Sequence, residues 1–241
     1  MRTLAIGDIH GGLKALKQLL QRMEVTSDDH FIFLGDYVDG WSESAQVIDF
    51  LIELDKTHNC IFIKGNHDIY CENWLQKKEA PDTWLFHGGT LTIESYENHS
   101  KEQKQMHLDF LKKMKLYHVD DKNRLFIHAG FTSMHGPYKE VYESNYNWDR
   151  TLWETALSMG KKLDMESVFY PKRLKLFDEI YIGHTPTTNY GIDKPMQGCN
   201  VWNIDTGAAF KGKLSAIDID SKEVFQSETV QSIYPNEKGR N

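Results

Sequence analysis

The sequence has few cysteines and no long apolar stretch. Its apolar runs, such as residues 31–34, are far shorter than the roughly 20 residues that cross a bilayer, so we expect no membrane-spanning helix and no membrane partner. The start, MRTLAIGD, also lacks the apolar segment of a secretory signal peptide, which favours a cytoplasmic location. The three cysteines, Cys60, Cys71 and Cys199, form no CxxC pair, so neither a disulfide framework nor a cysteine zinc site is expected.

Positive charge is also scarce. Lysine and arginine number 28 against 35 aspartates and glutamates, which gives a formal net charge of −7, and no block of like charges occurs. Long nucleic acids are bound by clustered cationic side chains that neutralise phosphates, so a long nucleic acid is not expected as a partner. Small or locally presented anions are compatible with this composition. Nothing in the pattern sets an oligomeric state.

The remaining composition is that of a globular protein. Of the 241 residues, 40% are hydrophobic and 26% are charged, which is ordinary for a chain that folds around a core. No repeat, low-complexity segment or linker divides the chain, so we predict a single domain over residues 1–241. Within it, residues 131–178 are expected to form an insertion that could cap the site. The polar residues from about 228 to 241 are expected to form a flexible tail.

The first half of the chain alternates strand and helix patterns. Short apolar runs, each followed by a glycine, predict buried parallel strands at residues 3–6, 31–34 and 61–63. Apolar residues spaced three and four apart predict helices between them, at residues 13–23 and 47–54. The glycines at 7, 35 and 65 are 28 and 30 residues apart, about the length of one βαβ unit. The carboxyl ends of the three strands should therefore meet at one edge of one sheet.

The second half begins with the same pattern and then changes. A helix is predicted at residues 102–116, and apolar runs at 125–127 and 180–182 again end in polar residues. Residues 201–204 and 214–219 instead alternate with a period of two, which is typical of antiparallel strands with one solvent-facing side. The chain is therefore expected to be of the α/β class, with a parallel first half and antiparallel strands near its end.

Every one of the five apolar runs before residue 190 ends in side chains that can bind a metal ion. These endings are GDIHG at 7–11, GDYVDG at 35–40, GNHD at 65–68, HAG at 128–130 and GHTP at 183–186. A single Asp-Gly pair is usually a turn and a single histidine is usually a surface or core residue. Five such endings at the carboxyl ends of strands, where α/β folds collect ligands, favour a functional site.

The types of ligand suggest which ions the site would hold. Mixed carboxylate, imidazole and amide groups suit Mn²⁺, Fe or Zn²⁺ better than Ca²⁺ or Mg²⁺. Six candidate ligands exceed the needs of one tetrahedral ion, which favours two divalent ions that share a carboxylate and lie roughly 3.5 to 4 Å apart.

Together these motifs resemble the ordered set of the calcineurin-like metallophosphoesterases, in the branch of the bacterial serine/threonine protein phosphatases and symmetrical diadenosine tetraphosphate hydrolases. Residues 84–91 and 203–208 resemble that branch too, and the likeness runs from Gly7 to about Asp218. The resemblance implies a four-layer α/β/β/α fold, a β-sandwich flanked by helices. This agrees with the strand patterns described above.

The resemblance also implies a role for each motif residue. Asp8, His10 and the bridging Asp36 would hold one ion, and Asp36, Asn66, His128 and His184 would hold the other. Manganese is the expected metal, with iron or zinc as alternatives. His67 would donate a proton to the leaving group and Asp39 would orient its ring; a purely supporting role for His67 is the alternative.

One departure from the family pattern concerns the phosphate. The family usually continues its second motif as Val-Asp-Arg-Gly, but here Gly40 and Trp41 follow Val38-Asp39, so a phosphate-binding arginine is missing. Arg150 and Lys64 are the candidate replacements. A surface arginine paired with a neighbouring acid is the alternative for Arg150. A second departure, Asp68 where eukaryotic members have glutamate, suggests no particular role.

These residues predict a metal-dependent phosphatase. A water shared by two divalent ions can lose its proton near neutral pH and attack phosphorus as a bridging hydroxide. A cysteine-dependent phosphatase is excluded because no cysteine begins a Cys-x5-Arg motif. The leading hypothesis is a serine/threonine protein phosphatase that acts on phosphorylated proteins, peptides or small phosphate esters. The alternative is a symmetrical dinucleoside polyphosphate hydrolase, and a metal-binding module without activity is disfavoured by the complete ligand set.

Overall fold

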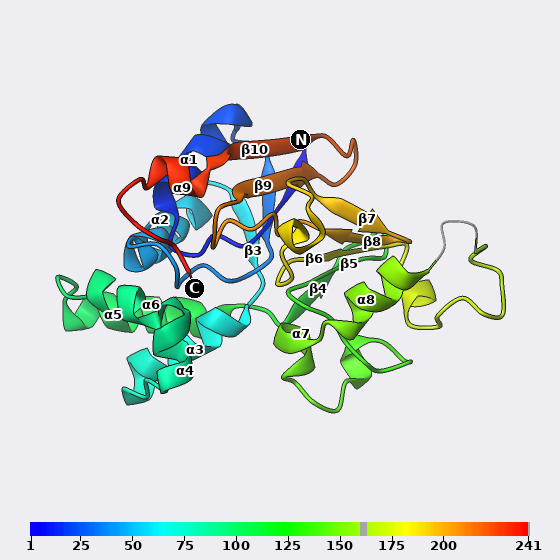
Figure 1. The fold of residues 1–241 in the computed structure, drawn as a ribbon, viewed down its shortest axis with the longest axis horizontal. Coiled ribbons are helices and arrows are strands. Elements are labelled where there is room, and N and C mark those ends of the chain that lie inside the picture. The colour runs from blue at the N-terminus through cyan, green and yellow to red at the C-terminus, as the bar shows by residue number, and fades with distance from the viewer. Residues whose placement is uncertain (160–162, 241) are drawn as a thin grey trace.

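The computed structural model describes residues 1–159 and 163–240, which form two stacked five-stranded sheets with helices on both outer faces (Figure 1). The first sheet has the order β10-β9-β1-β2-β3 and the second has the order β4-β5-β6-β8-β7. The first comprises β1 (Thr3–Ile6), β2 (His30–Phe33), β3 (Asn59–Phe62), β9 (Lys213–Asp218) and β10 (Val224–Thr229). The second comprises β4 (Tyr117–Val119), β5 (Arg124–Ile127), β6 (Glu179–Ile182), β7 (Met196–Gly198) and β8 (Val201–Asn203). The four-layer α/β/β/α prediction is confirmed.

The βαβ pattern of the first half is also confirmed. Strands β1, β2 and β3 pair in parallel, with Thr3 opposite His30 and His30 opposite Asn59, so their carboxyl ends lie at one edge. The helices that connect them are α1 (Leu13–Arg22) and α2 (Ser44–Asp55), whose apolar sides are buried. After β3 the chain forms α3 (Asn66–Lys77), α4 (Asp82–Trp84), α5 (Thr90–Ser95) and α6 (Lys101–Lys113).

Strand β8 differs from its expected pairing. The alternating pattern of residues 201–204 predicted an antiparallel strand with one wet side, but β8 pairs in parallel with β6 and in antiparallel fashion only with β7. The polar residue responsible for the alternation, Asn203, is buried, and its amide donates to the Thr185 carbonyl at 2.7 Å. A buried polar side chain with a partner therefore produced the pattern of a solvent-facing position.

Three apolar layers hold the sheets and helices together. Between the sheets, Ala5, Ile32 and Leu34 of the first sheet belong to the same cluster as Phe126 and Tyr181 of the second, and Phe126 stacks on Tyr181. The alternate residues of the same strands face outward. In the first sheet these pack against α1, α2, α3 and α6, and in the second they pack against the segment from Phe131 to Phe177. The period of two within each strand thus builds the β-sandwich.

Residues 131–178 contain α7 (Asn145–Trp148) and α8 (Thr151–Ser158) and cover the outer face of the second sheet; within this predicted insertion, residues 160–162 lie outside the described part. The predicted tail, residues 228–241, begins inside β10 and continues into α9 (Val230–Ile233), after which Tyr234 is only 2% exposed. Residue 241 is outside the described part.

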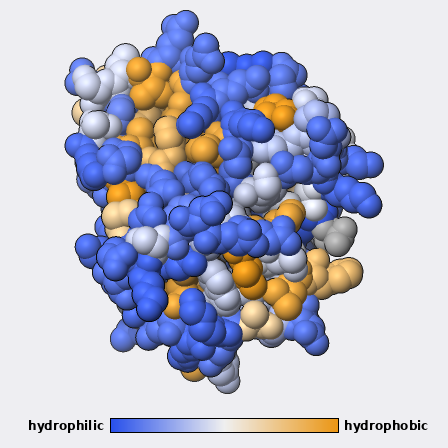
Figure 2. All heavy atoms as spheres, turned by 90° about the vertical axis from the view of Figure 1, so that its left-hand side faces the viewer, coloured by the Kyte–Doolittle hydropathy of each residue, from blue (hydrophilic) through white to orange (hydrophobic). Residues whose placement is uncertain are grey.

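No helix in the described ranges has the length and apolarity to cross a membrane. The face at the left of Figure 1 is mostly hydrophilic, with separate apolar areas (Figure 2).

Candidate metal centre

The six predicted ligands come together at the carboxyl edges of both sheets. Asp8 and His10 follow β1, Asp36 follows β2, and Asn66 is the first residue of α3 after β3. His128 and His184 follow β5 and β6 in the second sheet. All six are buried, with exposed fractions of 9% or less. The stacking of the two sheets therefore joins two groups of residues that are at least 60 positions apart in the chain, and it creates one polar cluster inside the protein.

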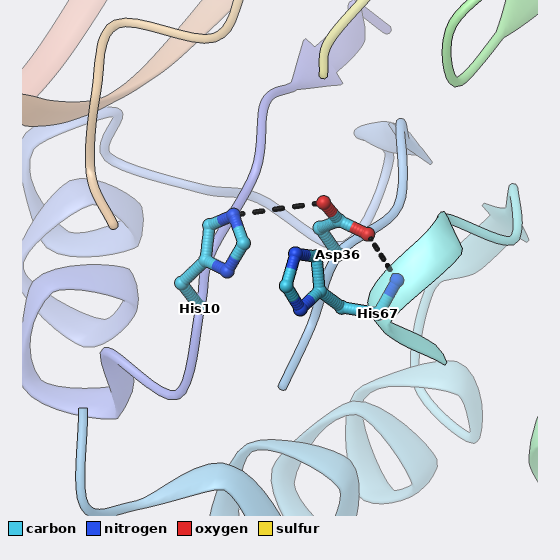
Figure 3. A group of neighbouring side chains, drawn as sticks. All are labelled: His10, Asp36 and His67. Carbon is cyan, nitrogen blue, oxygen red and sulfur yellow. Dashed lines mark hydrogen bonds and ion pairs between the residues drawn. The ribbon is translucent and has the colours of Figure 1, made fainter. Parts of the chain in front are cut away.

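Asp36 lies at the middle of this cluster. Its Oδ2 is 3.6 Å from Nε2 of His10 and 3.4 Å from Nε2 of His128. Its other oxygen, Oδ1, accepts the backbone N–H of His67 at 3.0 Å, and this bond orients the carboxylate (Figure 3). One oxygen therefore faces a candidate ligand from each sheet, an arrangement that would allow this carboxylate to bridge two ions.

Asn66 provides the second meeting point. Its Oδ1 lies 3.2 Å from Nε2 of His128 and 3.0 Å from Nδ1 of His184. Two ligand atoms on one tetrahedral ion, each bonded at about 2.1 Å, are about 3.4 Å apart, so the separations around Asn66 and Asp36 suit a shared ion. In addition, Nε2 of His184 is buried and has no hydrogen-bond partner among the described residues. The chemistry and spacing of these donors fit two metal ions.

The outer nitrogens of two imidazoles are held by backbone carbonyls. Nδ1 of His10 lies 2.9 Å from the carbonyl oxygen of Asp39, and Nδ1 of His128 lies 2.7 Å from that of Leu34. A carbonyl can only accept, so each Nδ1 carries a proton, and Nε2 is the nitrogen that faces Asp36 and would bind a metal ion. Backbone contacts of this kind fix both the tautomer and the direction of a metal-binding histidine.

The turns that carry the ligands need glycine and unusual backbone angles. A Cβ on Gly65 would lie 2.1 Å from Oδ1 of Asp36, and one on Gly183 would lie 2.1 Å from Oδ1 of Asp8. His10, Asp36 and His184 have positive φ angles of 51°, 52° and 69°. Such angles are unfavourable for residues with side chains and persist where the surrounding structure enforces them. The glycines of the motifs thus leave room for the carboxylates.

Burial controls the electrostatics of the cluster. It lowers the pKa of His10 to about 3 and that of His184 well below its usual value. Burial would also lower the pKa of His128, but the Asp36 carboxylate outweighs it and raises this pKa to about 10. Burial raises the pKa of Asp8 well above its usual value. His10 and His184 are therefore neutral, the form in which imidazole binds metal ions, and the buried carboxylates favour a cation beside them.

His67 and Asp39 form a pair at the border of the cluster. Nδ1 of His67 lies 2.6 Å from Oδ2 of Asp39, and the two rings of His67 and His10 are 5.0 Å apart. Asp39 also accepts the indole N–H of Trp84 at 2.6 Å and the hydroxyl of Thr92 at 2.6 Å. Nε2 of His67 is buried without a hydrogen-bond partner in the described ranges. This nitrogen is close enough to His10 and Asp36 to serve as a ligand as well as a proton donor.

Sequence reasoning assigned no role to the two residues that hold Asp39. Trp84 lies just before the turn at residues 85–89 and Thr92 shortly after it, and Gly88 in this turn packs directly against Gly40. The only sequence signal for this part of the site was the likeness of residues 84–91 to the family. Neither periodicity nor spacing indicates that an indole 45 positions away will contact Asp39.

Asp205 is a further buried residue of the centre that sequence reasoning did not identify as a site residue. Its Oδ1 accepts the backbone N–H of Gly207 at 2.9 Å. Burial raises its pKa to about 6, and its charge in turn contributes to the raised pKa of Asp8. The carboxylates of Asp8 and Asp205 are therefore close enough to repel each other.

Asp68 anchors the loop that carries Asp36. Its carboxylate accepts three backbone N–H groups, from Gly65 at 2.7 Å and from Asp36 and Tyr37 at 2.9 Å each. Burial raises its pKa to about 7. These three bonds tie the end of β2 to the start of α3, so the residue to which the sequence analysis gave no role positions the proposed bridging ligand.

We expect Asp68→Asn to destabilise the protein and weaken its metal binding. The amide has one accepting oxygen instead of two, and its N–H₂ group would face backbone donors. Leaving a buried donor unpaired costs about 1 to 3 kcal/mol. Denaturant unfolding with and without Mn²⁺ measures both effects, and Asp28→Asn, an exposed aspartate before β2, is the matched control. Equal unfolding curves for the two variants would contradict the anchoring role.

The two predicted phosphate-binding cations occupy different surroundings. Arg150 is exposed at the start of α8, and its positive charge contributes to the low pKa of His184, whose main cause is burial. Lys64 is directed to Glu72, with 2.6 Å between Nζ and Oε2. The charge of Arg150 thus acts on a candidate ligand, whereas the charge of Lys64 is already paired.

Comparison with known proteins gives the following matches. Residues 1–205 match the family model described as calcineurin-like phosphoesterase. The asymmetrical bis(5'-nucleosyl)-tetraphosphatase PrpE of Oceanobacillus iheyensis is 25% identical over 237 residues, which cover 92% of this chain and 90% of that protein. The protein of the same name from Anoxybacillus flavithermus is 27% identical, over 88% of each chain. A serine/threonine phosphatase structure from Saccharomyces cerevisiae shares the fold, with a TM-score of 0.64 at 14% identity over 95% of this chain and 80% of that one.

Proposed function

The chain belongs to the calcineurin-like phosphoesterase family, and from this premise we propose that it hydrolyses dinucleoside tetraphosphates asymmetrically, at a centre of two divalent ions. The membership makes it a metal-dependent hydrolase of phosphate esters, in a family that uses a dinuclear centre. The observation that carries the proposal is the position of Asp36 Oδ2, which faces one ligand from each sheet at 3.6 Å and 3.4 Å.

Each predicted ligand has a place in this proposal. Asp8 and His10 would hold one ion, and Asn66, His128 and His184 would hold the other, with Asp36 shared. When bound, two divalent ions activate a water and polarise the phosphoryl oxygens. Mn²⁺ is the metal proposed for this mixed donor set, with Fe or Zn²⁺ as alternatives. The chain contributes the fixed orientations of the His10 and His128 rings and the buried carboxylates that would bring the ions together.

His67 is proposed as the proton donor to the leaving oxygen. Nδ1 of His67 lies 2.6 Å from Oδ2 of Asp39, and this contact fixes the orientation of the ring. Nε2, which has no partner among the described residues, is the atom that would donate the proton. Asp39 is itself fixed by Trp84 and Thr92, which prevents the pair from swinging away. An imidazole that is oriented by a carboxylate in this way is a typical general acid.

The choice of substrate rests on the curated relatives. Both match over nearly their whole length and are named asymmetrical tetraphosphatases, which supports a dinucleotide over the phosphoprotein of the leading sequence hypothesis. The alternative sequence hypothesis was a hydrolase that cleaves the dinucleotide symmetrically. The names of these relatives instead support asymmetrical cleavage. Similarity to the yeast serine/threonine phosphatase at 14% identity concerns the fold alone. A cytoplasmic location stays a prediction, as does a contact of Arg150 with substrate.

We expect diadenosine tetraphosphate to be converted into ATP and AMP in the presence of Mn²⁺. Asymmetrical cleavage breaks the link between an outer phosphate and its neighbour, which leaves one phosphate on one nucleoside and three on the other. Symmetrical cleavage breaks the central link and would give two molecules of ADP. Chromatographic separation of the products distinguishes the two, and prior chelation should abolish turnover until Mn²⁺ is restored. A panel of phosphoserine and phosphothreonine peptides is the comparison. Rapid peptide hydrolysis with the dinucleotide left intact would refute the proposed substrate and support a protein phosphatase.

A further inference from the structure

The loop that lacks the expected arginine binds the last segment of the chain instead. Gly40 has a φ of 117° and no side chain, and the next residue, Trp41, is fully buried. The indole of Trp41 stacks on Tyr234 with a centroid distance of 5.2 Å, and its N–H donates to the Ala208 carbonyl at 2.7 Å. The residues that replace the family pattern at positions 40 and 41 therefore serve as an attachment point for residues 234–240.

Further contacts along the segment make this attachment specific. Glu237 accepts the backbone N–H of Ser42 at 3.0 Å and its hydroxyl at 2.8 Å, and the Tyr234 hydroxyl donates to Glu43. A Cβ on Gly239 would lie 2.8 Å from the Trp41 ring, so the backbone passes directly over the indole. The segment is thus held at several points, and these contacts fix the backbone position of Arg240.

The residue that this segment presents is Arg240. Its backbone N–H donates to the Ala209 carbonyl at 2.8 Å, and its guanidinium lies 5.7 Å from the centre of the Phe210 ring. Its Nε is buried and has no hydrogen-bond partner among the described residues. A Cβ on Gly40 would lie 3.3 Å from Cβ of His10 and 3.7 Å from the Ala209 carbonyl oxygen that accepts the Arg240 N–H. The backbone of Arg240 therefore lies near the metal centre, and its guanidinium forms no ion pair within residues 1–159 and 163–240.

Arg240 also lines a cavity of about 410 Å³ that contains two more cations, Lys211 and Lys238, and the polar residues Thr188 and Asn189. Thr188 and Asn189 belong to the loop after His184, and the N–H of Thr187 in this loop donates to the carbonyl of Asp205 at 2.9 Å, so the loop connects the cavity to the metal centre. Within the described ranges, none of the three cations forms an ion pair, whereas nearby Lys213 is paired with Asp193 at 2.8 Å. In a chain of net charge −7, three cations that line one cavity and form no ion pair among the described residues create a local concentration of positive charge.

We propose that Arg240, with Lys211 and Lys238, forms a subsite that binds phosphates of the substrate beyond the phosphoryl group held at the metal centre. A phosphate monoester has no second anionic group to occupy such a subsite, whereas a nucleoside polyphosphate does. The guanidinium and ammonium groups match phosphate oxygens in charge and in hydrogen bonding. The inference rests on the proposed function in so far as the ligand is the polyphosphate chain of a nucleotide.

The test compares two substrates in the full-length, Mn²⁺-loaded protein. We expect Arg240→Gln to lower kcat/KM for diadenosine tetraphosphate about tenfold to hundredfold, the range for a lost charged hydrogen bond, and to lower that for nitrophenyl phosphate much less. Lys211→Gln should show the same selectivity with a smaller loss, and Arg240→Lys should recover part of it. Arg22→Gln, an exposed arginine of α1 paired with Glu228, is the matched control. Thermal unfolding of each variant checks that the fold is kept.

Inhibition separates this subsite from the proposed function. At a fixed concentration of free Mn²⁺, ATP should inhibit nitrophenyl phosphate hydrolysis more strongly than AMP, and Arg240→Gln should reduce that difference. If the wild-type protein leaves the dinucleotide intact but keeps this Arg240-dependent difference, the proposed function fails and the subsite stands. Equal losses on both substrates, or equal inhibition by ATP and AMP in the wild-type protein, would overturn the subsite.

Discussion

Replacing Asp36 by asparagine is expected to remove both metal ions and reduce hydrolysis to the level of the chelated protein. One oxygen of Asp36 faces His10 at 3.6 Å and His128 at 3.4 Å, so its charge serves both halves of the centre. Loss of a residue that only supports a ligand typically costs about 10- to 100-fold in metal affinity, so loss of a shared ligand should cost more. Elemental analysis of the dialysed protein and an assay with nitrophenyl phosphate measure the two effects.

Asp39→Asn is the matched control for this variant. Both aspartates are buried in the same loop, and both lie within hydrogen-bonding distance of His67, but the Asp39 side chain contacts Trp84 and Thr92 rather than a predicted ligand. The control should therefore keep its metal content and lose rate. Equal metal loss in the two variants would mean that Asp39 supports the ions, and the distinction between ligand and orienting residue would be wrong.

The fold and the clustering of the six candidate ligands were predictable because one simple rule links them to the sequence. A buried parallel strand is a continuous apolar run, and its carboxyl end faces the same edge as those of its neighbours. Asp8, Asp36 and His128 each directly follow such a run or its glycine, so local patterns were enough to place them together. The resemblance added the pairing of the two sheets, which no local pattern contains.

The supporting residues of the site, the attachment of the C-terminal segment and the parallel pairing of β8 with β6 could not be predicted, because they depend on contacts between distant parts of the chain. Trp84 reaches Asp39 across 45 positions, and Tyr234 stacks on Trp41 across 193. Polar segments such as residues 228–240 are typical of tails, but tertiary contacts such as those of Tyr234 and Glu237 hold this one against the rest of the protein. The pairing of β8 was only partly predicted: it is antiparallel to β7 but parallel to β6, and Asn203, whose polarity suggested a solvent-facing side, is buried and donates to the Thr185 carbonyl.

His67→Asn is expected to slow hydrolysis in proportion to how strongly the leaving group needs a proton. Nδ1 of His67 is held by Asp39, and its Nε2 has no partner among the described residues, as a proton donor to the leaving oxygen requires. General acid assistance is typically worth about 10² to 10⁴ in rate, and a good leaving group such as nitrophenolate needs little of it. Rates for aryl phosphates from phenyl to dinitrophenyl should therefore depend more steeply on leaving-group pKa in the variant.

Metal content decides between the two roles that the geometry allows His67. Its ring lies 5.0 Å from that of His10, and its side chain belongs with His10 and Asp36 to a group that could bind one ion (Figure 3). A proton donor can be removed without loss of metal, whereas a ligand cannot. His135→Asn, an exposed histidine outside the centre, controls for the loss of an imidazole. If His67→Asn loses metal and slows every aryl phosphate by the same factor, His67 is a ligand, and the leaving oxygen must receive its proton from another group or from water.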